Sequence, residues 1–299
     1  MTDILHKVQM FLDTACQEQV DIPEKLIEEF GEACKNAIKK QFTDKRENKF
    51  SIRASNVGRP LCQLQMEKNE VKGESVSYNT KMRNLLGDLI EATAVLVLKS
   101  SGVEVKNEQK RVKYNLSDKS HIDGQFDVEI DNKIWDIKSA SPFAFEHKFK
   151  NGFEAVVADD NFGYLSQGYL YAEADKKKFG GWIAINKSTG EWAIAETPLD
   201  DTKYKKKAIK LVKDNAKSII DKEPFKRCFS DIEETYRKQP TGNRILNFVC
   251  GYCQYKKPCW GDTLEYLPQQ QSKGQRPKWV WYTQLNNRKE EYENSQQKS

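Results

Sequence analysis

The sequence lacks any apolar run of the roughly 18 to 20 residues that a bilayer-spanning helix needs. Its first residues, MTDILHKVQMFLDTA, also lack the basic start and the small-residue cleavage site of a signal peptide. Net charge is small, because 49 basic and 44 acidic residues leave a formal charge of +5, which permits a polyanionic partner without indicating one. We therefore expect a soluble cytoplasmic protein with no membrane contact, in the host cytoplasm if a virus encodes it.

Histidine is scarce, and the three that occur, His6, His121 and His147, do not have the spacing of metal ligands. Internal repeats are absent as well. Cysteine is more plentiful, with seven residues, an odd number for a chain without a secretion signal, where disulfides are rarely kept. We therefore expect cysteines that cluster to bind a metal.

The 299 residues suffice for one large domain with a sizeable apolar core. Apolar spacing predicts two amphipathic helices within residues 1–50 and further helices over 78–102, 161–177 and 201–222. Between 103 and 140 the apolar period shifts toward two, which predicts strands with a turn at Asp131 and Asn132, and a second hairpin follows over 180–198. The pattern indicates an α/β protein with a mixed central sheet flanked by helices. We expect a helical N-terminal segment (1–50), a core domain closed by cysteines (51–262) and a polar tail (263–299).

Three carboxylates occur where a buried element would favour apolar residues. Glu91 lies inside the most apolar predicted helix, and Asp127 and Asp136 lie inside apolar strands. A buried unpaired carboxylate costs on the order of several kcal/mol, so each needs a cation or strong donors. Strand alternation puts Asp136 and Lys138 on one face, and the hairpin sets Asp127 across from Asp136 or one pair away. Two carboxylates that close repel each other unless they share a cation.

Hard oxygen ligands favour Mg²⁺ or Mn²⁺. The chemistry that such a site supports is attack of metal-activated water on a phosphodiester, with Lys138 orienting the water or offsetting developing charge. The alternative is a hairpin with surface acids and a chance Asp-x-Lys, since that tripeptide alone has a high false-positive rate. Three further acids of this region, Asp123, Glu129 and Asp131, are expected to be ordinary exposed residues.

The order of these features resembles the PD-(D/E)xK nuclease superfamily. The resemblance rests on helical Glu91 after Gly87, then Gly124-x-x-Asp127, Asp136-x-Lys138 and Gln167-x-x-x-Tyr171. The last of these motifs narrows the resemblance to the RecB-like branch of the superfamily. Two departures are that Glu91 stands where many relatives have histidine, and that the proline of the superfamily's name is missing.

The resemblance implies a restriction-endonuclease-like core and assigns roles by motif. Metal ligands would be Glu91, Asp127, Asp136 and the carbonyl of Ile137, with Lys138 assisting the attacking water. It also implies that Gln167 and Tyr171 brace the site or contact DNA. Without the resemblance these two residues would be read as part of an ordinary amphipathic helix.

Cys250, Cys253 and Cys259 form a Cys-x2-Cys-x5-Cys motif suited to one metal centre. The fourth ligand is open among the other four cysteines, and zinc is an alternative metal. The spacing resembles the iron-sulfur nucleases of the RecB-like branch, of the AddB and CRISPR-associated exonuclease types, which implies a 4Fe-4S cluster with Cys62 as fourth ligand. The remaining three are then expected to be plain buried thiols: Cys16, Cys34 and Cys228.

The predicted function is a Mg²⁺- or Mn²⁺-dependent DNA nuclease, an exonuclease acting on single strands or DNA ends in recombination, repair or DNA processing. The alternative is a non-catalytic DNA-binding or assembly subunit that works with recombination or CRISPR-adaptation proteins, for example in spacer acquisition. A third hypothesis is a zinc-stabilised interaction module. DNA contacts are expected from the segment after Lys138 through Phe143, Phe145, Lys148 and Lys150. Trp279, Trp281 and Tyr282 either stack on DNA or pack as an edge strand, and packing is favoured.

Overall fold

The computed structural model describes residues 3–44, 50–117, 120–261, 263–269 and 278–286. The chain forms two compact units, the first from residues 1–59 and 76–222 and the second from residues 60–75 and 223–299. This division does not follow the boundaries expected after residues 50 and 262, because the chain leaves the first unit for residues 60–75 and then returns to it.

The first unit is built on a five-stranded sheet with the strand order β1-β4-β5-β6-β7. Only β5 and β6 pair in parallel, whereas the other three neighbouring pairs are antiparallel. The predicted α/β class with a mixed sheet flanked by helices is therefore confirmed. The strands are β1 (Val105–Lys106), β4 (Val128–Ile130), β5 (Lys133–Ala140), β6 (Lys178–Asn186) and β7 (Trp192–Glu196).

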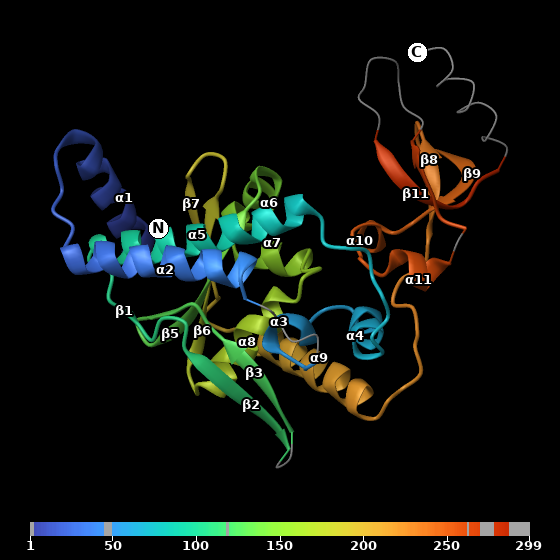
Figure 1. The fold of residues 1–299 in the computed structure, drawn as a ribbon, viewed down its shortest axis with the longest axis horizontal. Helices are drawn as coiled ribbons and strands as arrows, with labels where there is room; N and C mark the ends of the chain where they lie inside the picture. The colour runs from blue at the N-terminus through green and yellow to red at the C-terminus, as the bar shows by residue number, and fades with distance from the viewer. Residues whose placement is uncertain (1–2, 45–49, 118–119, 262, 270–277, 287–299) are drawn as a thin grey trace. The chain divides into compact units, whose positions relative to one another are not determined.

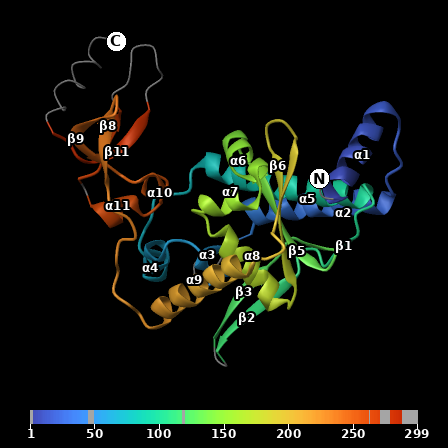
Figure 2. The ribbon, with the colours of Figure 1, turned by 180° about the vertical axis from the view of Figure 1, so that it is seen from behind.

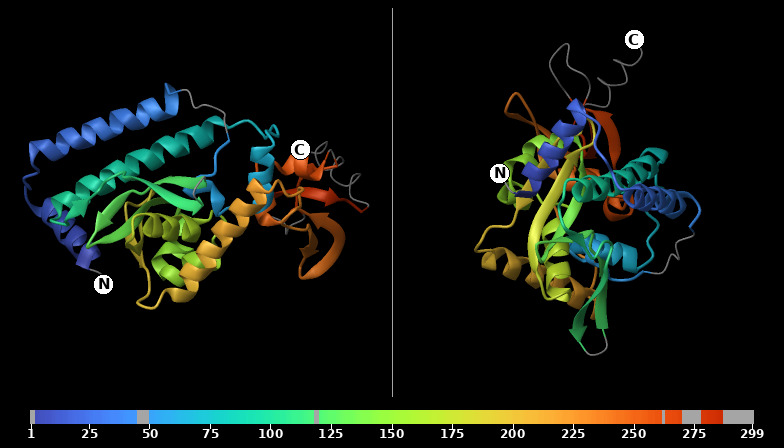
Figure 3. Two further views of the ribbon diagram at one scale, coloured as in Figure 1. Left: turned by 90° about the horizontal axis from the view of Figure 1, so that it is seen from below. Right: turned by 90° about the vertical axis from the view of Figure 1, so that its left-hand side faces the viewer.

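Long helices cover both faces of this sheet, as predicted from the apolar spacing (Figure 1). On β5, Trp135 and Ile137 pack in one apolar cluster with α1 and α5, whereas Ile134 packs in another with α8 and α9. Helices α2 and α5 lie side by side (Figure 3). Among the described helices, none is long and apolar enough to cross a membrane. The helices are α1 (Asp3–Gln17), α2 (Glu24–Phe42), α5 (Tyr78–Ser100), α8 (Tyr164–Ala174) and α9 (Thr202–Ile220).

Shorter elements complete the first unit. A separate antiparallel hairpin of β2 (Arg111–Ser117) and β3 (Ser120–Gln125) packs against α8 and against α3 (Ala54–Val57). Helices α6 (Pro142–His147) and α7 (Phe153–Ala158) lie beside β6 and β7 (Figure 2). These two short helices were not predicted, since neither is long enough to display a helical repeat.

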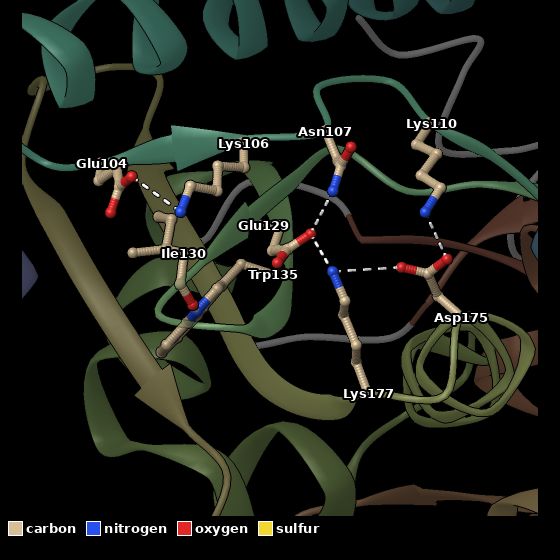
Figure 4. A network of polar contacts seen from close by, with 9 residues as sticks. All are labelled: Glu104, Lys106, Asn107, Lys110, Glu129, Ile130, Trp135, Asp175 and Lys177. Carbon is tan, nitrogen blue, oxygen red and sulfur yellow. Dashed lines mark hydrogen bonds and ion pairs between the residues drawn. The ribbon is translucent and has the colours of Figure 1, made fainter.

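Strand β4, which lies between β1 and β5, is held by a buried ionic network (Figure 4). Glu129 is only 4% exposed, so the expectation that it is an ordinary exposed acid is wrong. Its carboxylate pairs with Lys177 and accepts a hydrogen bond from Asn107. Burial acts to raise the pKa of Glu129, but these two partners outweigh it and lower the pKa. Lys177 also lies 3.5 Å from Asp175, so the network ties β4 to the end of α8.

The second unit contains a four-stranded antiparallel sheet with the order β10-β11-β9-β8. Two of its strands, β10 (Glu265–Pro268) and β11 (Trp279–Gln284), lie within the segment expected to be a polar tail, while residues 270–277 and 287–299 of that segment lie outside the described residues. Strand β11 is flanked on both sides, so the aromatic residues around Trp279 lie on an inner strand and not on the expected edge strand. The other elements are α4 (Leu61–Lys68), β8 (Ile232–Tyr236), β9 (Gln239–Ile245), α10 (Phe248–Gly251) and α11 (Lys256–Trp260).

Candidate metal centre

The β4–β5 hairpin places the two strand carboxylates side by side. Its turn residues, Asp131 and Asn132, have φ angles of 50° and 58°, as a two-residue turn with both residues left-handed requires. The register of β4 with β5, extended by one residue, sets Asp127 opposite Asp136. Both the predicted turn and the predicted juxtaposition are therefore confirmed.

Asp136 and Lys138 form a buried ion pair on one face of β5. Lys138 Nζ lies 2.6 Å from Asp136 Oδ2 and 4.7 Å from the centre of the Tyr164 ring. Burial acts to lower the pKa of Lys138, but the carboxylates of Asp136 and Asp127 outweigh it and raise this pKa above its ordinary value. The two carboxylates thus favour the charged ammonium form of Lys138.

Asp127 is held by the backbone of the neighbouring strand. Its Oδ2 accepts a 2.6 Å hydrogen bond from the amide of Ile137, the residue between Asp136 and Lys138. The pKa of Asp127 is raised well above its ordinary value, mainly by burial and then by the negative charges of Glu91 and Asp136. Three carboxylates therefore act on one another at this point of the fold.

Glu91 reaches the same site from helix α5. Its Oε1 accepts a hydrogen bond from the side-chain amide of Gln109, whose nitrogen also lies 3.4 Å from Asp127 Oδ1. Burial is the main cause that raises the pKa of Glu91, to about 7. The positive charge of Lys40 acts to lower this pKa, and the negative charge of Asp136 raises it further. The amide of Gln109 thus bridges the two acids, as a cation between them would.

Gln109 is a site residue that the sequence did not reveal. It lies in the loop between β1 and β2, among basic residues. Its own backbone amide donates to the carbonyl of Asp127 at 2.9 Å, and the side chain of Gln125 donates to its carbonyl at 2.8 Å. No local pattern marks a polar loop residue that contacts acids 18 positions away on either side.

The donor set fits a hard divalent cation by its chemistry. It offers oxygens from three carboxylates, Glu91, Asp127 and Asp136, beside the ammonium group of Lys138, and a bound cation would relieve the repulsion among these carboxylates. Among the described residues, no three histidine, cysteine, aspartate or glutamate side chains converge into a ready-made metal-binding group. The bridging amide of Gln109 would therefore have to give way to a cation held by Glu91 and Asp127.

A cavity of about 530 Å³ opens beside these acids, between α2 and α5. Glu91, Gln109 and Asp127 form part of its wall, and Lys40 of α2 lies on the opposite side. Lys40 bonds Asp88 of α5 at 2.8 Å, one turn before Glu91. The N-terminal helical segment, which the sequence placed outside the core domain, thus forms one wall of the candidate site.

Gln167 and Tyr171 lie on helix α8 and are hydrogen-bonded to each other. Gln167 Nε2 donates a 2.8 Å hydrogen bond to the Tyr171 hydroxyl, one helical turn away. Tyr171 is buried, and its ring lies so close to Gly124 that a Cβ there would approach it to 2.6 Å. The glycine of the Gly124-x-x-Asp127 motif therefore makes room for this tyrosine, and the placement favours bracing over contact with DNA.

The segment after Lys138 does not offer the four contacts expected of it. Phe143 is 68% exposed, but Phe145 is 1% exposed and belongs to the apolar core, so its predicted stacking on DNA is wrong. Lys148 pairs with Asp159 at 2.6 Å. The remaining lysine of the set, at position 150, pairs with two glutamates on the surface.

All four predicted cluster ligands, Cys62, Cys250, Cys253 and Cys259, belong to the second unit. Cys228 joins them, because its sulfur accepts a 3.1 Å hydrogen bond from the amide of Cys62. The expectation that Cys16 and Cys228 are plain buried thiols is wrong, since both are exposed.

The pair of Cys62 and Cys228 is strongly polarised. A hydrogen bond between the two thiols raises the pKa of Cys62 and lowers that of Cys228 to about 6. The charge of Cys259 raises the pKa of Cys62 further. The second unit therefore offers five candidate ligands instead of four, and the choice between Cys62 and Cys228 stays open.

Comparisons with known proteins add little. No family model and no curated protein matches this sequence. Among solved structures, a crystal structure of SSO0001 aligns with 80% of this chain and 96% of its own, at 17% identity and a TM-score of 0.39. A likeness at this level supports no conclusion about function.

Proposed function

We propose that this protein is a metal-dependent DNA nuclease of the RecB-like PD-(D/E)xK type, acting on single-stranded DNA or DNA ends. The observation that supports it best is the group of three interacting carboxylates, Glu91, Asp127 and Asp136, around the one buried ammonium group of Lys138. Such a group is costly for folding alone, since several acids share a single counter-charge. Sites of this kind are typical of function.

The roles follow from the positions of the side chains. Glu91, Asp127 and Asp136 would hold a Mg²⁺ or Mn²⁺ ion, which when bound supplies Lewis acidity toward a phosphoryl oxygen and acidifies water. The Ile137 amide fixes the direction of the Asp127 carboxylate, and its carbonyl stays the proposed additional ligand.

Lys138 provides a positive charge at a fixed place. Its ammonium group, held 2.6 Å from Asp136 and over the Tyr164 ring, is suited to orient water and to stabilise charge that develops on the phosphate. Because the neighbouring carboxylates raise its pKa, the charged form that donates hydrogen bonds is favoured. Gln167 and Tyr171 keep the rear of this site packed.

The proposal includes a 4Fe-4S cluster in the second unit, bound by cysteines among the set of five. Thiolate ligands fit this cluster, with zinc as the other metal that thiolates hold. The proposal is supported by the hydrogen bond from the backbone amide of Cys62 to the sulfur of Cys228, which brings together two cysteines from distant parts of the chain. Its role would be to join the segments 60–75 and 223–299 that form this unit.

The decisive experiment is a nuclease assay on labelled DNA with Mg²⁺ or Mn²⁺, comparing wild type with Asp136→Asn and Lys138→Met. These substitutions keep side-chain size while removing one charge each. We expect each to reduce the rate by roughly 100-fold or more, the effect of losing a key electrostatic group. Linear and circular single strands in parallel would separate exonuclease from endonuclease action.

The matched control is Asp131→Asn, which removes an exposed acid from the turn of the same hairpin. It should cleave like wild type. Circular dichroism melts of all three variants guard against loss of fold. If the wild type and the Asp136→Asn variant degrade DNA at equal rates, the assignment of this site is wrong.

A further inference from the structure

Strand β11 of the second unit carries aromatic residues on both of its faces, and the two faces differ. Tyr282 is 1% exposed, and its hydroxyl donates to the buried carboxylate of Glu234 at 2.6 Å. Trp279 and Trp281 alternate with it and therefore point to the opposite face. The inward tyrosine has a packing role, whereas the outward tryptophans need another explanation.

The outward rings form a continuous stack. Strand register pairs Tyr266 of β10 directly with Trp281, and Trp279 lies two residues along on the same face. The Tyr266 ring centre lies 4.8 Å from that of Trp281 and 5.4 Å from that of Trp279, with interplanar angles of 31° and 35°. We call these three residues the aromatic stack.

The aromatic stack faces solvent at one end. Tyr266 is 49% exposed and Trp279 is 44% exposed, unusually high values for two large rings that already touch each other. A planar group could extend the stack at Trp279 without moving a strand. Aromatic rings presented this way on a sheet are typical of surfaces that hold unpaired bases.

Positive charge lies at the other end. The ammonium groups of Lys256 and Lys257, both on α11, lie 5.1 Å and 5.7 Å from the centre of the Trp281 ring. Lys256 is buried and already paired with Glu74, so its charge is largely offset. Lys257 is exposed and, at the stack's edge, is the cation placed to meet a phosphate.

We propose that the aromatic stack is a binding site for single-stranded DNA, with a base stacked on Trp279 and a backbone phosphate near Lys257. Half-exposed rings at one end of the stack and a lysine at the other complement the flat bases and the anionic phosphates of a strand that runs along the stack. The choice of DNA over RNA rests on the proposed function. Base stacking is tolerant of sequence, so the site would hold a strand without reading it.

The test is a fluorescence anisotropy titration of the full chain with a labelled oligo(dT) of about 20 nucleotides in buffer free of divalent ions. Under these conditions the proposed nuclease is inactive, so binding is measured apart from cleavage. We expect Trp279→Ala to weaken binding by roughly 5- to 100-fold, the range found for single stacking residues. Trp279→Phe should restore most of it, because a flat ring is kept.

Two controls make the result specific. Tyr78→Ala removes an exposed ring from the first unit and should leave the affinity unchanged. Lys257→Ala should reduce the dependence of affinity on salt concentration. The variant makes one phosphate contact fewer and therefore releases fewer counterions on binding. Thermal melts of each variant confirm that β11 is still folded.

Equal affinities of wild type and Trp279→Ala would overturn the proposal, as would a wild type that binds no oligonucleotide. Equal or tighter binding of oligo(U) would overturn the assignment to DNA. Failure of the proposed function has a different signature: an intact protein that binds oligo(dT) through Trp279 but does not cleave DNA with Mn²⁺.

Discussion

At the residue scale, the candidate site depends on how buried charges are partnered. Lys138 is the only ammonium group bonded to the Asp136 carboxylate among the described residues, and the Tyr164 ring limits where it can move. Asp127 is fixed by a backbone amide and Glu91 by a side-chain amide. The contacts of Asp136 and Asp127 follow from the hairpin. The contact of Glu91 depends on Gln109, whose amide can be exchanged for a cation.

Gln109→Met should make the first unit more dependent on a divalent ion. The substitution keeps side-chain length but leaves the carboxylates of Glu91 and Asp127 without their shared donor, a loss of about 1–3 kcal/mol when no cation is present. Mn²⁺ would replace the donor, so the rise in Tm on adding Mn²⁺ should be larger in the variant than in wild type. Differential scanning fluorimetry with and without Mn²⁺ measures both values.

The control for this prediction is Gln239→Met, which removes an exposed glutamine of the second unit. It should respond to Mn²⁺ as the wild type does. An identical Mn²⁺ response in Gln109→Met would mean that the amide does not occupy a cation's place.

At the element scale, the sheet of the second unit is held by polar contacts more than by apolar ones. Glu234 of β8 is buried and accepts hydrogen bonds from Asn243 of β9 at 2.8 Å and from Tyr282 of β11 at 2.6 Å. Just before β8, Asp231 accepts from Arg244 at 2.6 Å and from Thr283 at 2.7 Å. Two acids thus tie three strands together, which makes this sheet sensitive to pH.

Asp231→Asn should destabilise the second unit near neutral pH but not in acid. The hydrogen bond with Arg244 is the main cause that lowers the pKa of Asp231, so its ionised form stabilises the folded state. This stabilisation is fully present above about pH 4, the pKa of Asp231 in the unfolded chain. It is lost as the pH falls through the lower pKa that Asp231 has in the folded state. We expect a deficit of about 1 kcal/mol at pH 7, because the pair is partly exposed.

Urea denaturation followed by tryptophan fluorescence between about pH 3 and 7 measures this difference. The gap between variant and wild type should narrow as the pH falls below about 4. Asp13→Asn, at an exposed position of α1, serves as the control. A gap that stays constant over the whole pH range would show that the charge of Asp231 does not stabilise the sheet.

The elements that sequence predicted well are those with a strong local signal. Helix α5 has a long apolar repeat, and the β4–β5 hairpin has alternating residues around a two-residue turn, so Asp127, Asp136 and Lys138 could be placed in advance. Strands β8 and β9 were missed because their inner face is partly polar: Glu234 and Asn243 look like surface residues until their partners are known. Local patterns cannot show such distant pairings.

At the scale of the whole molecule, the chain passes between its two units three times, at residues 59/60, 75/76 and 222/223. The second unit therefore consists of two segments far apart in sequence. Gln65 illustrates how they meet, since its side chain donates to the carbonyls of Glu223 and Pro224 at 3.2 Å and 3.1 Å. The contact of Cys62 with Cys228 joins the same two segments. Neither pairing has a sequence signal, which is why Cys228 was set aside.

If a metal cluster joins these segments, losing it should unfold the second unit while the first stays intact. Cys253→Ser removes a ligand from the Cys-x2-Cys-x5-Cys motif, and Cys16→Ser, at an exposed position of α1, is the matched control. We expect Cys253→Ser to lose absorbance near about 400 nm, which cysteine-ligated iron-sulfur clusters show. Metal binding contributes folding free energy, so the melting of the second unit should fall by more than about 10 °C.

The two units can be observed separately. Trp260, Trp279 and Trp281 lie in the second unit and report on it. Hydrogen exchange of the β5 and β6 amides reports on the first unit. Retained protection of those amides in Cys253→Ser, together with early exchange across β8 to β11, would support a clasp confined to the second unit. If the wild type is colourless and contains zinc, the site is a zinc site and not an iron-sulfur cluster. If Cys253→Ser melts at the same temperature as Cys16→Ser, no metal at this motif joins the two segments.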